Sequence, residues 1–312
     1  MNQEYIPKGR AKTLARKMDK IDAASQKPAK KKWIQNRMLR KMLSNRLSVI
    51  GLVIFLVILF SSIFASILSP YPPGQISLKD TLQPPSMKHL FGTDRLGRDV
   101  LSRVMHGGQV SILVGLGSAL GAALVGVLLG AYFGYKGGWM DSLVMRISEV
   151  FMSFPQIILV LLLVSITGQS LANLLIIFIL TGWGSVYRMT RAKMLSIREE
   201  EYVQALRAFG LSDFVICFKH MLPNAIGPIA VNITLSTAMF ILQETSLSFL
   251  GLGVPVQIAT WGNIINVANN LSILQSNWWI WLPVGLVISL FVLSINFIGD
   301  GLRDSTDPTQ MG

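Results

Sequence analysis

The chain has 312 residues, of which 51% are hydrophobic and 14% are charged. Soluble domains carry about 25% charged residues, so this composition excludes a disordered chain and an ordinary soluble enzyme and indicates a membrane protein with several spans. The net charge of +12 is concentrated at one end, because 14 of the 28 lysines and arginines lie in residues 1–46. A single cysteine, Cys217, excludes a disulfide scaffold and a cysteine-based metal site.

Six segments are long and apolar enough to cross a bilayer as helices, which takes about 20 residues each. They cover residues 47–69, 107–135, 143–167, 171–188, 223–250 and 283–298. Pro155 is expected to kink or to start the third helix. The sequence therefore predicts an all-α membrane protein with six transmembrane helices.

The basic residues predict which side of the membrane each loop occupies. With both termini in the cytoplasm, the inner segments hold 23 lysines and arginines and the outer segments hold five. Lysine and arginine favour cytoplasmic loops, so an N-in, C-in arrangement is predicted. This orientation, together with attraction to anionic lipid, explains the basic tail without a nucleic-acid partner.

The spans and charges divide the chain into consecutive regions. These are a basic cytoplasmic tail (1–46), a first transmembrane anchor (47–69), an external loop (70–106), a core membrane domain (107–303) with a cytoplasmic loop (188–222), and a cytoplasmic C-terminal tail (304–312). In the second span, Gly117 and Gly121 form one GxxxG pair and Gly126 and Gly130 form another. Such pairs predict a close helix–helix interface, although small residues are also common in membrane helices generally.

The cytoplasmic loop is expected to form two short helices. Ser196 and Glu199 fit a capping box at the start of the first helix, and Gly210 fits the glycine that follows its end. Ser212 is expected to cap the second helix, with Asp213 in its first turn.

An apolar surface is expected around the turn between these helices. Tyr202, Leu206 and Phe209 recur at helical spacing beside Ala205, and Phe214 follows in the second helix. A loop that faces only water does not need these side chains. They either dock a cytosolic partner or pack back on the chain's own bundle, and the pattern favours neither.

The external loop is expected to contain an amphipathic helix over residues 94–103. Arg95, Asp99 and Arg103 alternate in charge at intervals of four, and Asp94 and Arg98 add a second pair. Such a helix would lie at the outer membrane interface before the second span. It is a candidate outer docking helix beside the gate, or an element that only positions the second span.

Glu244 is the only charged residue between Met221 and Gly299. Intramembrane carboxylates are costly and usually face a cavity or a partner, so Glu244, with Ser246 and Ser248 beside it, is a candidate for the translocation path or its outer gate. The alternative is that Glu244 lies at the headgroup level and is hydrated.

The cytoplasmic loop also resembles a known motif. Residues 202–224 resemble the E-A-A-x3-G-x9-I-x-L-P loop of ABC importer permeases, which in that family forms a coupling helix seated in a cleft of the ATPase. The departures are Gln204 for Glu, Leu206 for Ala and His220 for Ile. The resemblance implies that ATPase coupling involves Tyr202, Gln204, Ala205, Leu206, Phe209, Gly210, Leu211, Ser212, Asp213, Leu222 and Pro223.

Four further blocks narrow this resemblance. Residues 91–103, 154–155, 246–253 with 260–262, and 299–304 are similar to segments of the C-type permeases of oligopeptide, dipeptide and nickel importers, so the similarity runs from about residue 45 to 308. It implies a type I ABC importer permease fold in the bacterial plasma membrane and transport of peptides, most simply oligopeptides. The implied partners are a second permease subunit in a heterodimer, two cytoplasmic ATPase subunits, an extracellular or lipid-anchored substrate-binding protein, and membrane lipid.

No catalytic residue, cofactor site or metal site is expected in this chain. It has no G-x-x-x-x-G-K-[ST] motif, so ATP and Mg²⁺ are expected to bind to the partner ATPase subunits. An ion-coupled secondary transporter is a different possibility, which usually shows internal repeats and several buried charges. A permease of the same family that carries nickel chelates or glutathione is another.

Overall fold

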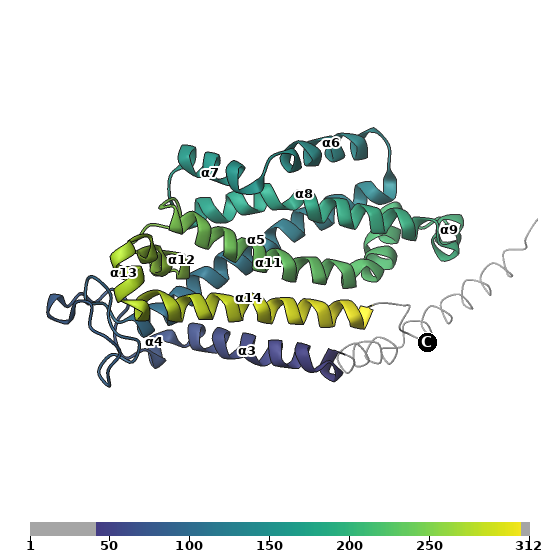
Figure 1. The fold of residues 1–312 in the computed structure, drawn as a ribbon. Coiled ribbons are helices and arrows are strands. Elements are labelled where there is room, and N and C mark those ends of the chain that lie inside the picture. The colour runs from purple at the N-terminus through teal and green to yellow at the C-terminus, as the bar shows by residue number, and fades with distance from the viewer. Residues whose placement is uncertain (1–41, 307–312) are drawn as a thin grey trace, which may run out of the picture.

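The computed structural model describes residues 42–306, and within that range the chain is helical apart from loops and one isolated bridge between Thr93 and Asp99. Figure 1 shows the long helices side by side in a bundle. Most of the expected basic tail, residues 1–41, and residues 307–312 of the C-terminal tail lie outside the described residues.

Within residues 42–306, five helices are long and apolar enough to cross a membrane, and a bent pair supplies a sixth span. The five are α3 (Arg46–Ile63), α5 (Val100–Lys136), α8 (Leu171–Arg198), α11 (Ile226–Phe249) and α14 (Trp278–Thr306). Each overlaps a span that hydropathy predicts, and α4 (Ala65–Leu68) completes the first one before Pro70. The predicted all-α, six-span architecture is confirmed.

The sixth span is the third one in chain order. It consists of α6 (Trp139–Ser153) and α7 (Gln156–Thr167), which meet at 89°. Pro155 lies in the break, where it cannot donate an N–H and disfavours the helical conformation at Phe154. The kink predicted at Pro155 is confirmed, and both halves pack along α8 (Figure 1).

Glycines bring α5 and α8 into close contact. A Cβ atom at Gly126 would lie 2.7 Å from the carbonyl oxygen of Trp183, and one at Gly130 would lie 2.7 Å from that of Tyr187. Gly121 faces Ile179 one turn further out, where a Cβ would lie 2.5 Å from Cδ1. The crowded interface predicted from the GxxxG pairs is therefore the α5–α8 contact.

Short elements close the two ends of the bundle. One end carries η1 (Leu78–Asp80), α12 (Trp261–Ile265), η4 (Asn266–Asn269) and α13 (Leu271–Ser276). The other carries α9 (Glu201–Ala208), α10 (Asp213–Val215), a π-helical turn η2 (Ile216–Met221) and a 3₁₀ turn η3 (Leu222–Ala225). The start of α3 and the end of α14 lie at the α9 end (Figure 1), as six spans require.

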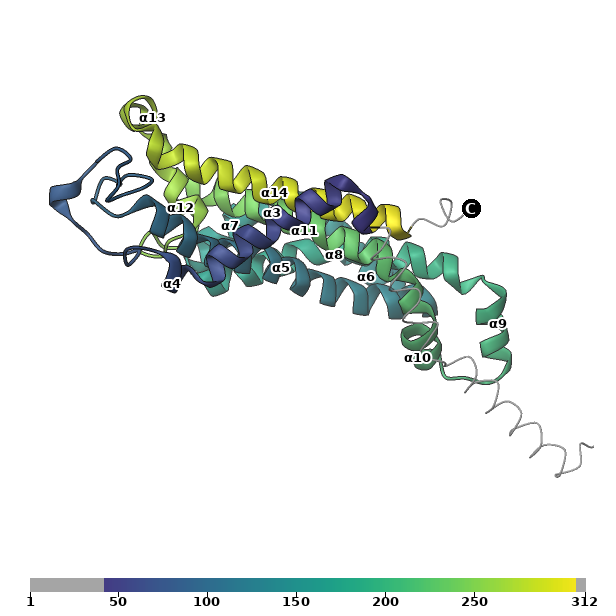
Figure 2. The ribbon, with the colours of Figure 1, turned by 90° about the horizontal axis from the view of Figure 1, so that it is seen from below.

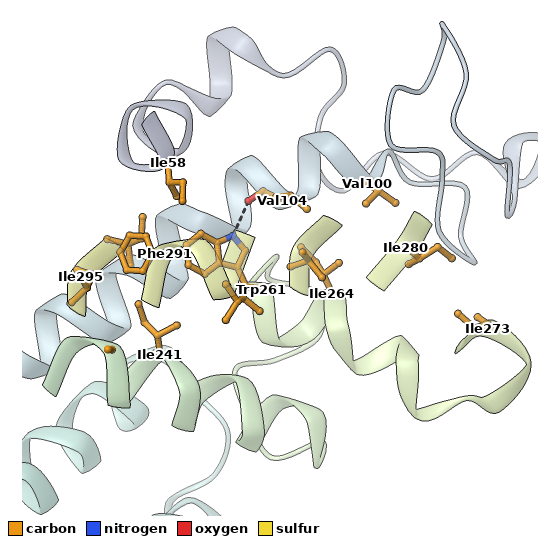
Figure 3. Packing of buried hydrophobic residues seen from close by; sticks show 14 residues of the cluster. Ile58, Val100, Val104, Ile241, Trp261, Ile264, Ile273, Ile280, Phe291 and Ile295 are labelled. Carbon is orange, nitrogen blue, oxygen red and sulfur yellow. Dashed lines mark hydrogen bonds between the residues drawn. The ribbon is translucent and has the colours of Figure 1, made fainter. Parts of the chain in front are cut away.

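Figure 2 shows α3 running beside α14, with α9 and α10 projecting from one end of the bundle. This end is cytoplasmic by the distribution of basic residues. The opposite, outer end is built on a cluster of buried apolar residues in which Trp261, Ile241 and Phe291 meet (Figure 3). Each end therefore has its own packing, and the candidate sites are divided between them.

Candidate functional sites at the two ends of the bundle

A tight glycine turn ends α9 at the cytoplasmic end. Gly210 has φ of +74°. The N–H of Leu211 donates to the carbonyl of Leu206 at 3.3 Å, and the N–H of Gly210 donates to that of Arg207 at 2.9 Å. These two bonds are those of a Schellman motif, which favours glycine because other residues are strained at positive φ. The predicted glycine turn is confirmed.

The start of this first helix differs from the prediction. Ser196 and Glu199 do not form a capping box, because α8 continues through Ser196 to Arg198. The next helix, α9, begins at Glu201, and the side chain of its N-cap residue, Glu200, makes no capping bond.

The extension of α8 has packing and ionic partners in the cytoplasmic end of the bundle. Met194 is fully buried there, and Ile197 packs in the same cluster. Arg191 Nε donates to Asp141 Oδ1 of α6 at 2.6 Å, and the Tyr187 hydroxyl donates to the same oxygen at 2.9 Å. These contacts favour a continuous helix over a new start at Ser196.

Residues 201–225 form a helical hairpin, in which α9 and the glycine turn are followed by α10, η2 and η3. Three of its aromatic side chains, Tyr202, Phe209 and Phe214, are exposed, and we call them the aromatic knuckle. Their exposed fractions are 40%, 66% and 63%. On the other face of the hairpin, Val203 and Ile216 are fully buried against the bundle. The hairpin thus packs back on its own chain with one face and leaves an apolar surface uncovered on the other.

The remaining residues predicted for coupling surround this knuckle. Gln204, Ala205, Ser212, Asp213 and Pro223 are exposed, whereas Leu206, Leu211 and Leu222 are half-buried. Ser212 holds the predicted N-cap position of α10, although its side chain makes no capping bond. The predicted set is therefore gathered on one hairpin.

Tyr135, at the inner end of α5, joins the two arms of the hairpin. Its hydroxyl donates to Asp213 Oδ1 at 2.9 Å and accepts from Arg207 Nε at 3.1 Å. The Arg207 guanidinium also lies over the Tyr135 ring, 4.7 Å from its centre. Sequence reasoning missed Tyr135, because it lies 72 residues from Arg207 and 78 from Asp213 along the chain.

The second arm of the hairpin continues directly into a span. The helical run from Asp213 to Phe249 is continuous, passing through the π-helical and 3₁₀ turns before α11. Pro223 lies in the 3₁₀ turn, where its missing N–H interrupts the α-helical pattern. The hairpin and α11 are therefore joined by an unbroken helical run.

The outer segment 94–103 is not the amphipathic helix that the charge pattern predicts. Thr93 and Asp99 form an isolated bridge around a turn at residues 95–96, and α5 begins only at Val100. Asp94 Oδ1 accepts from the N–H of Leu96 at 2.8 Å and from that of Arg98 at 3.0 Å. This side chain replaces the backbone acceptors of a helix, and Gly97, with φ of +68°, completes the turn.

The alternating charges predicted for one helix face are accordingly not aligned along a helix. Asp94 does pair with Arg98, with Oδ2 to Nε at 2.7 Å, but across the turn. Arg103 is buried, with its Nε 3.8 Å from Asp94 Oδ2, whereas Arg95 is exposed and Asp99 becomes the N-cap of α5. The candidate outer docking helix is therefore a folded loop, and of its five predicted charged residues only Arg95 and Arg98 keep exposed surface.

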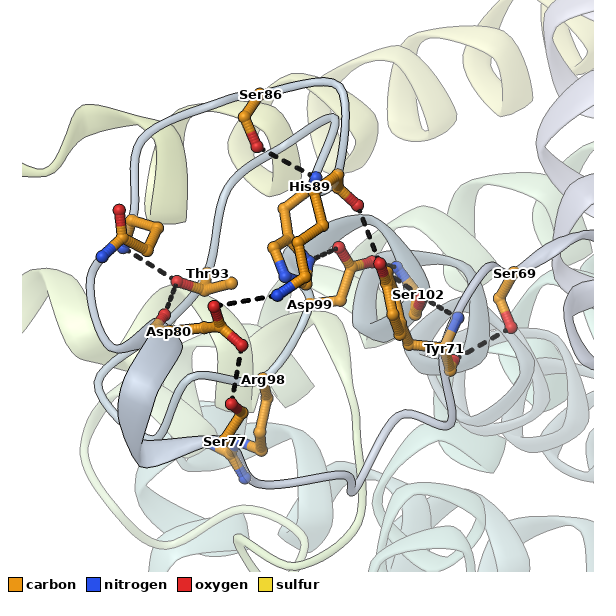
Figure 4. A network of polar contacts seen from close by, with 12 residues as sticks. Ser69, Tyr71, Ser77, Asp80, Ser86, His89, Thr93, Arg98, Asp99 and Ser102 are labelled. Carbon is orange, nitrogen blue, oxygen red and sulfur yellow. Dashed lines mark hydrogen bonds and ion pairs between the residues drawn. The ribbon is translucent and has the colours of Figure 1, made fainter.

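A network of buried polar side chains holds this outer loop (Figure 4). His89 Nδ1 lies 2.9 Å from Asp99 Oδ1, and Asp99 Oδ2 accepts from the Ser102 hydroxyl at 2.7 Å. The N–H of Tyr71 donates to the same hydroxyl at 3.2 Å, and its ring lies 4.8 Å from that of His89. His89 is buried.

A second set of contacts closes the loop at its exposed edge. Asp80 accepts from the Ser77 hydroxyl at 2.6 Å and from Lys88 Nζ at 2.9 Å. These hydrogen bonds hold the pKa of Asp80 below its usual value, and the bond to Asp80 raises the pKa of Lys88.

Glu244 has no exposed surface. Its carboxylate accepts from the hydroxyls of Ser248 at 2.8 Å, Thr260 at 3.0 Å and Ser111 at 3.4 Å. It is therefore not hydrated at the headgroup level, and in this structure neither Glu244 nor the buried Ser248 lines an open path. Ser246 is exposed.

The hydrogen bonds of Glu244 connect three elements at the outer end, α5, α11 and the N-terminus of α12. Trp261, the first residue of α12, donates its backbone N–H to Ser111 Oγ at 3.0 Å and its indole N–H to the Val104 carbonyl at 3.0 Å (Figure 3). Gly262 lies so close that a Cβ there would be 2.9 Å from Glu244 Oε1. Glu244 thus fastens the start of α12 to two spans, α5 and α11.

Comparison with known proteins decides the family. Residues 126–310, more than half of the chain, match the binding-protein-dependent transport system inner membrane component family. The chain belongs to this family. Residues 36–85 of this permease also match the N-terminal transmembrane domain of oligopeptide transport permease C.

Curated relatives cover most of the permease. A putative peptide permease protein of Brucella suis is 41% identical over 272 residues, which cover 87% of this chain and 90% of the relative. The dipeptide transport system permease protein of Bacillus subtilis is 38% identical over 269 residues, covering 86% of this chain and 84% of the relative. The permease is thus a multi-pass transport subunit of the bacterial plasma membrane with the type I ABC permease fold.

Proposed function

We propose that this permease forms half of an ATP-driven import path for peptides, and that a second permease subunit forms the other half. Two cytoplasmic ATPase subunits bind ATP and Mg²⁺, and an extracellular or lipid-anchored binding protein delivers the peptide. The names of the relatives, which are a peptide permease and a dipeptide permease, support the substrate class.

The aromatic knuckle carries the proposal for an ATPase partner. Tyr202, Phe209 and Phe214 expose apolar surface at the cytoplasmic end, where water would otherwise cover them. Burying a side chain of this size stabilises a contact by about 1.5–3 kcal/mol, and contiguous exposed apolar surface is typical of an interaction site. A cleft in an ATPase subunit that covers the knuckle would remove these apolar side chains from water.

The connections of the knuckle support a lever mechanism. Arg207 and Asp213 bind the hairpin to Tyr135 of α5, and the helical run from Asp213 continues into α11. When the ATPase subunits approach each other, the hairpin moves with them and carries both spans. Coupling requires that the partners bind the inward-facing and outward-facing states with different affinities.

Import by reconstituted vesicles tests this function. Vesicles that contain this permease, its second permease and both ATPase subunits are expected to accumulate peptide only when ATP and the binding protein are present. Import driven by a proton gradient without ATP would instead indicate an ion-coupled transporter. Import of a nickel chelate or glutathione, with no import of peptide, would overturn the substrate class.

A double substitution at the knuckle tests its role. Phe209→Ala with Phe214→Ala is expected to reduce import at least tenfold while the permease still inserts and assembles with its sister permease, because both rings are exposed. Phe60→Ala is the matched control, since Phe60 is 56% exposed on α3, far from the hairpin. Equal import by the double variant and the control would refute the docking role.

A further inference from the structure

A row of polar side chains runs along one face of α11 within the membrane. Asn232, Ser236, Gln243 and Ser246 follow one another at intervals of four, seven and three residues, which places them on one side of a helix. Met239, which is 54% exposed, lies on the same side between Ser236 and Gln243. Ser246 is exposed, and the other three are half-buried. The Ser236 hydroxyl donates to Asn232 Oδ1 at 3.3 Å, so this part of the row is already oriented.

A chain of hydrogen bonds extends the row to α7 and α8. Gln243 Nε2 donates to Gln156 Oε1 at 3.0 Å, and Gln156 Nε2 donates to Thr181 Oγ1 at 3.3 Å. Thr181 in turn donates to the carbonyl of Ile177 at 2.9 Å. Gln156 is the first residue of α7, directly after the break at Pro155, so the chain links α11 to the bent span.

One acceptor at the head of this chain has no partner. Gln243 Oε1 makes no hydrogen bond to any residue between 42 and 306, although its atom is buried. A buried polar atom without a partner is destabilising. The terminal torsion of a glutamine is broad, so this amide can turn toward a ligand that supplies an N–H.

The polar row differs from the surface that the first span exposes. On α3 the exposed residues Val53, Leu56, Val57 and Phe60 are all apolar, as contact with lipid requires. Amide and hydroxyl groups in hydrocarbon are destabilising unless they are paired. The Ser246 hydroxyl already donates to the Leu242 carbonyl at 2.8 Å, so the group of the row that most requires a polar ligand is the unpaired Gln243 Oε1.

We propose that this polar row, Asn232, Ser236, Gln243 and Ser246 of α11 together with Gln156 of α7, contacts the main chain of the peptide in transit. The inference rests on the proposed function. Amides and hydroxyls both donate and accept hydrogen bonds, so they pair with the N–H and C=O groups that every peptide presents. The row carries no charge, so it accepts peptides without regard to the charge of their side chains.

Thiol labelling of the assembled transporter tests the location of the row. Ser236→Cys and Ser246→Cys are expected to react with a charged, membrane-impermeant methanethiosulfonate reagent, and transported peptide is expected to slow that reaction. Val57→Cys, on the apolar face of α3, is the control and is expected to stay unreactive. The native Cys217 is fully buried and gives a low background.

Other labelling results would overturn the inference. If both serine positions stay unreactive in the working transporter, the row is packed in a dry contact with the second permease. If they react at the same rate with and without peptide, the row faces water but not the substrate. Wild-type transporter that still imports peptide with ATP separates these results from a failure of the proposed function.

Peptide kinetics supply a second readout. Gln243→Met keeps a similar length without hydrogen-bonding groups and is expected to raise the KM for import about 3–10-fold, the loss of one hydrogen bond. The increase should be similar for acidic, basic and neutral peptides of one length. An unchanged KM, or an increase confined to one class of side chain, would contradict recognition of the main chain.

Discussion

The outer and cytoplasmic ends of the permease differ in which side chains they bury and which they expose. At the outer end, charged and polar groups such as Asp99, Glu244 and His89 are buried and held by partners within the chain. At the cytoplasmic end, the apolar rings of Phe209 and Phe214 are left in the open. These charged groups of the outer end are thus paired within the chain, although Ile76, Leu78 and Met87 stay exposed there, whereas the cytoplasmic end presents the aromatic surface that we propose an ATPase subunit covers.

The largest expected effect concerns the buried network at the outer end. Glu244→Ala leaves the hydroxyls of Ser111, Ser248 and Thr260 without their acceptor and is expected to lower the stability of the permease by about 2–4 kcal/mol. Thermal unfolding in detergent measures the loss. Glu244→Gln keeps the shape and one acceptor oxygen, so its loss should be smaller. Equal stability of Glu244→Ala and wild type would show that this network does not hold the outer end.

The turn at Gly210 comes next. Gly210→Val places a β-branched residue at positive φ, which costs about 1–3 kcal/mol, and no atom lies within 4 Å of the new Cβ, so the effect is one of backbone conformation. We expect ATP hydrolysis to continue while peptide import is lost.

Gly168→Val is the matched control for that variant. Gly168 also has positive φ, at +83°, and open space around it, but it joins α7 to α8 at the outer end. Import should therefore survive there. Loss of import in both variants would indicate a general effect of strain rather than a role for the hairpin.

A smaller effect is expected at Tyr135. Tyr135→Phe removes the hydroxyl that joins Arg207 to Asp213 and is expected to lower the ratio of peptide imported to ATP hydrolysed about twofold to fivefold, with about 1 kcal/mol of stability lost. Tyr132→Phe is the control three residues away on α5, where the hydroxyl accepts only from Lys136 at 3.4 Å. If both variants couple equally well, the Tyr135 node does not transmit movement.

The two ends also differ in how far the sequence predicts them. Hydropathy locates the spans, Pro155 the break and Gly210 the turn, because each of these signals is local. The conformation of the outer loop is not predicted, because Asp94 and Arg98 can pair across a turn as well as along a helix. Glu244 escapes because its partners Ser111 and Thr260 are 133 and 16 residues away, and only the fold brings them together.

The smallest expected effect lies at the exposed edge of the outer loop. The pKa of Asp80 is lowered by its hydrogen bonds to Ser77 and Lys88. These bonds therefore stabilise the loop at pH values above 3.8, the ordinary pKa of aspartate, and their contribution is lost as the pH falls through the lowered pKa of Asp80. Asp80→Asn should speed hydrogen exchange in residues 77–89 at neutral pH. The difference from wild type should vanish in acid, and a difference that persists there would contradict this assignment.

Hydrogen exchange measured at both ends tests most directly whether the ATPase subunits cover the cytoplasmic hairpin and leave the outer loop unchanged. We predict that adding the ATPase subunits to the assembled permeases slows exchange in residues 201–215, which hold the aromatic knuckle. Exchange in residues 92–103, in the buried network of the outer loop, should stay unchanged. Unaltered exchange in 201–215 on formation of the full complex would contradict the account.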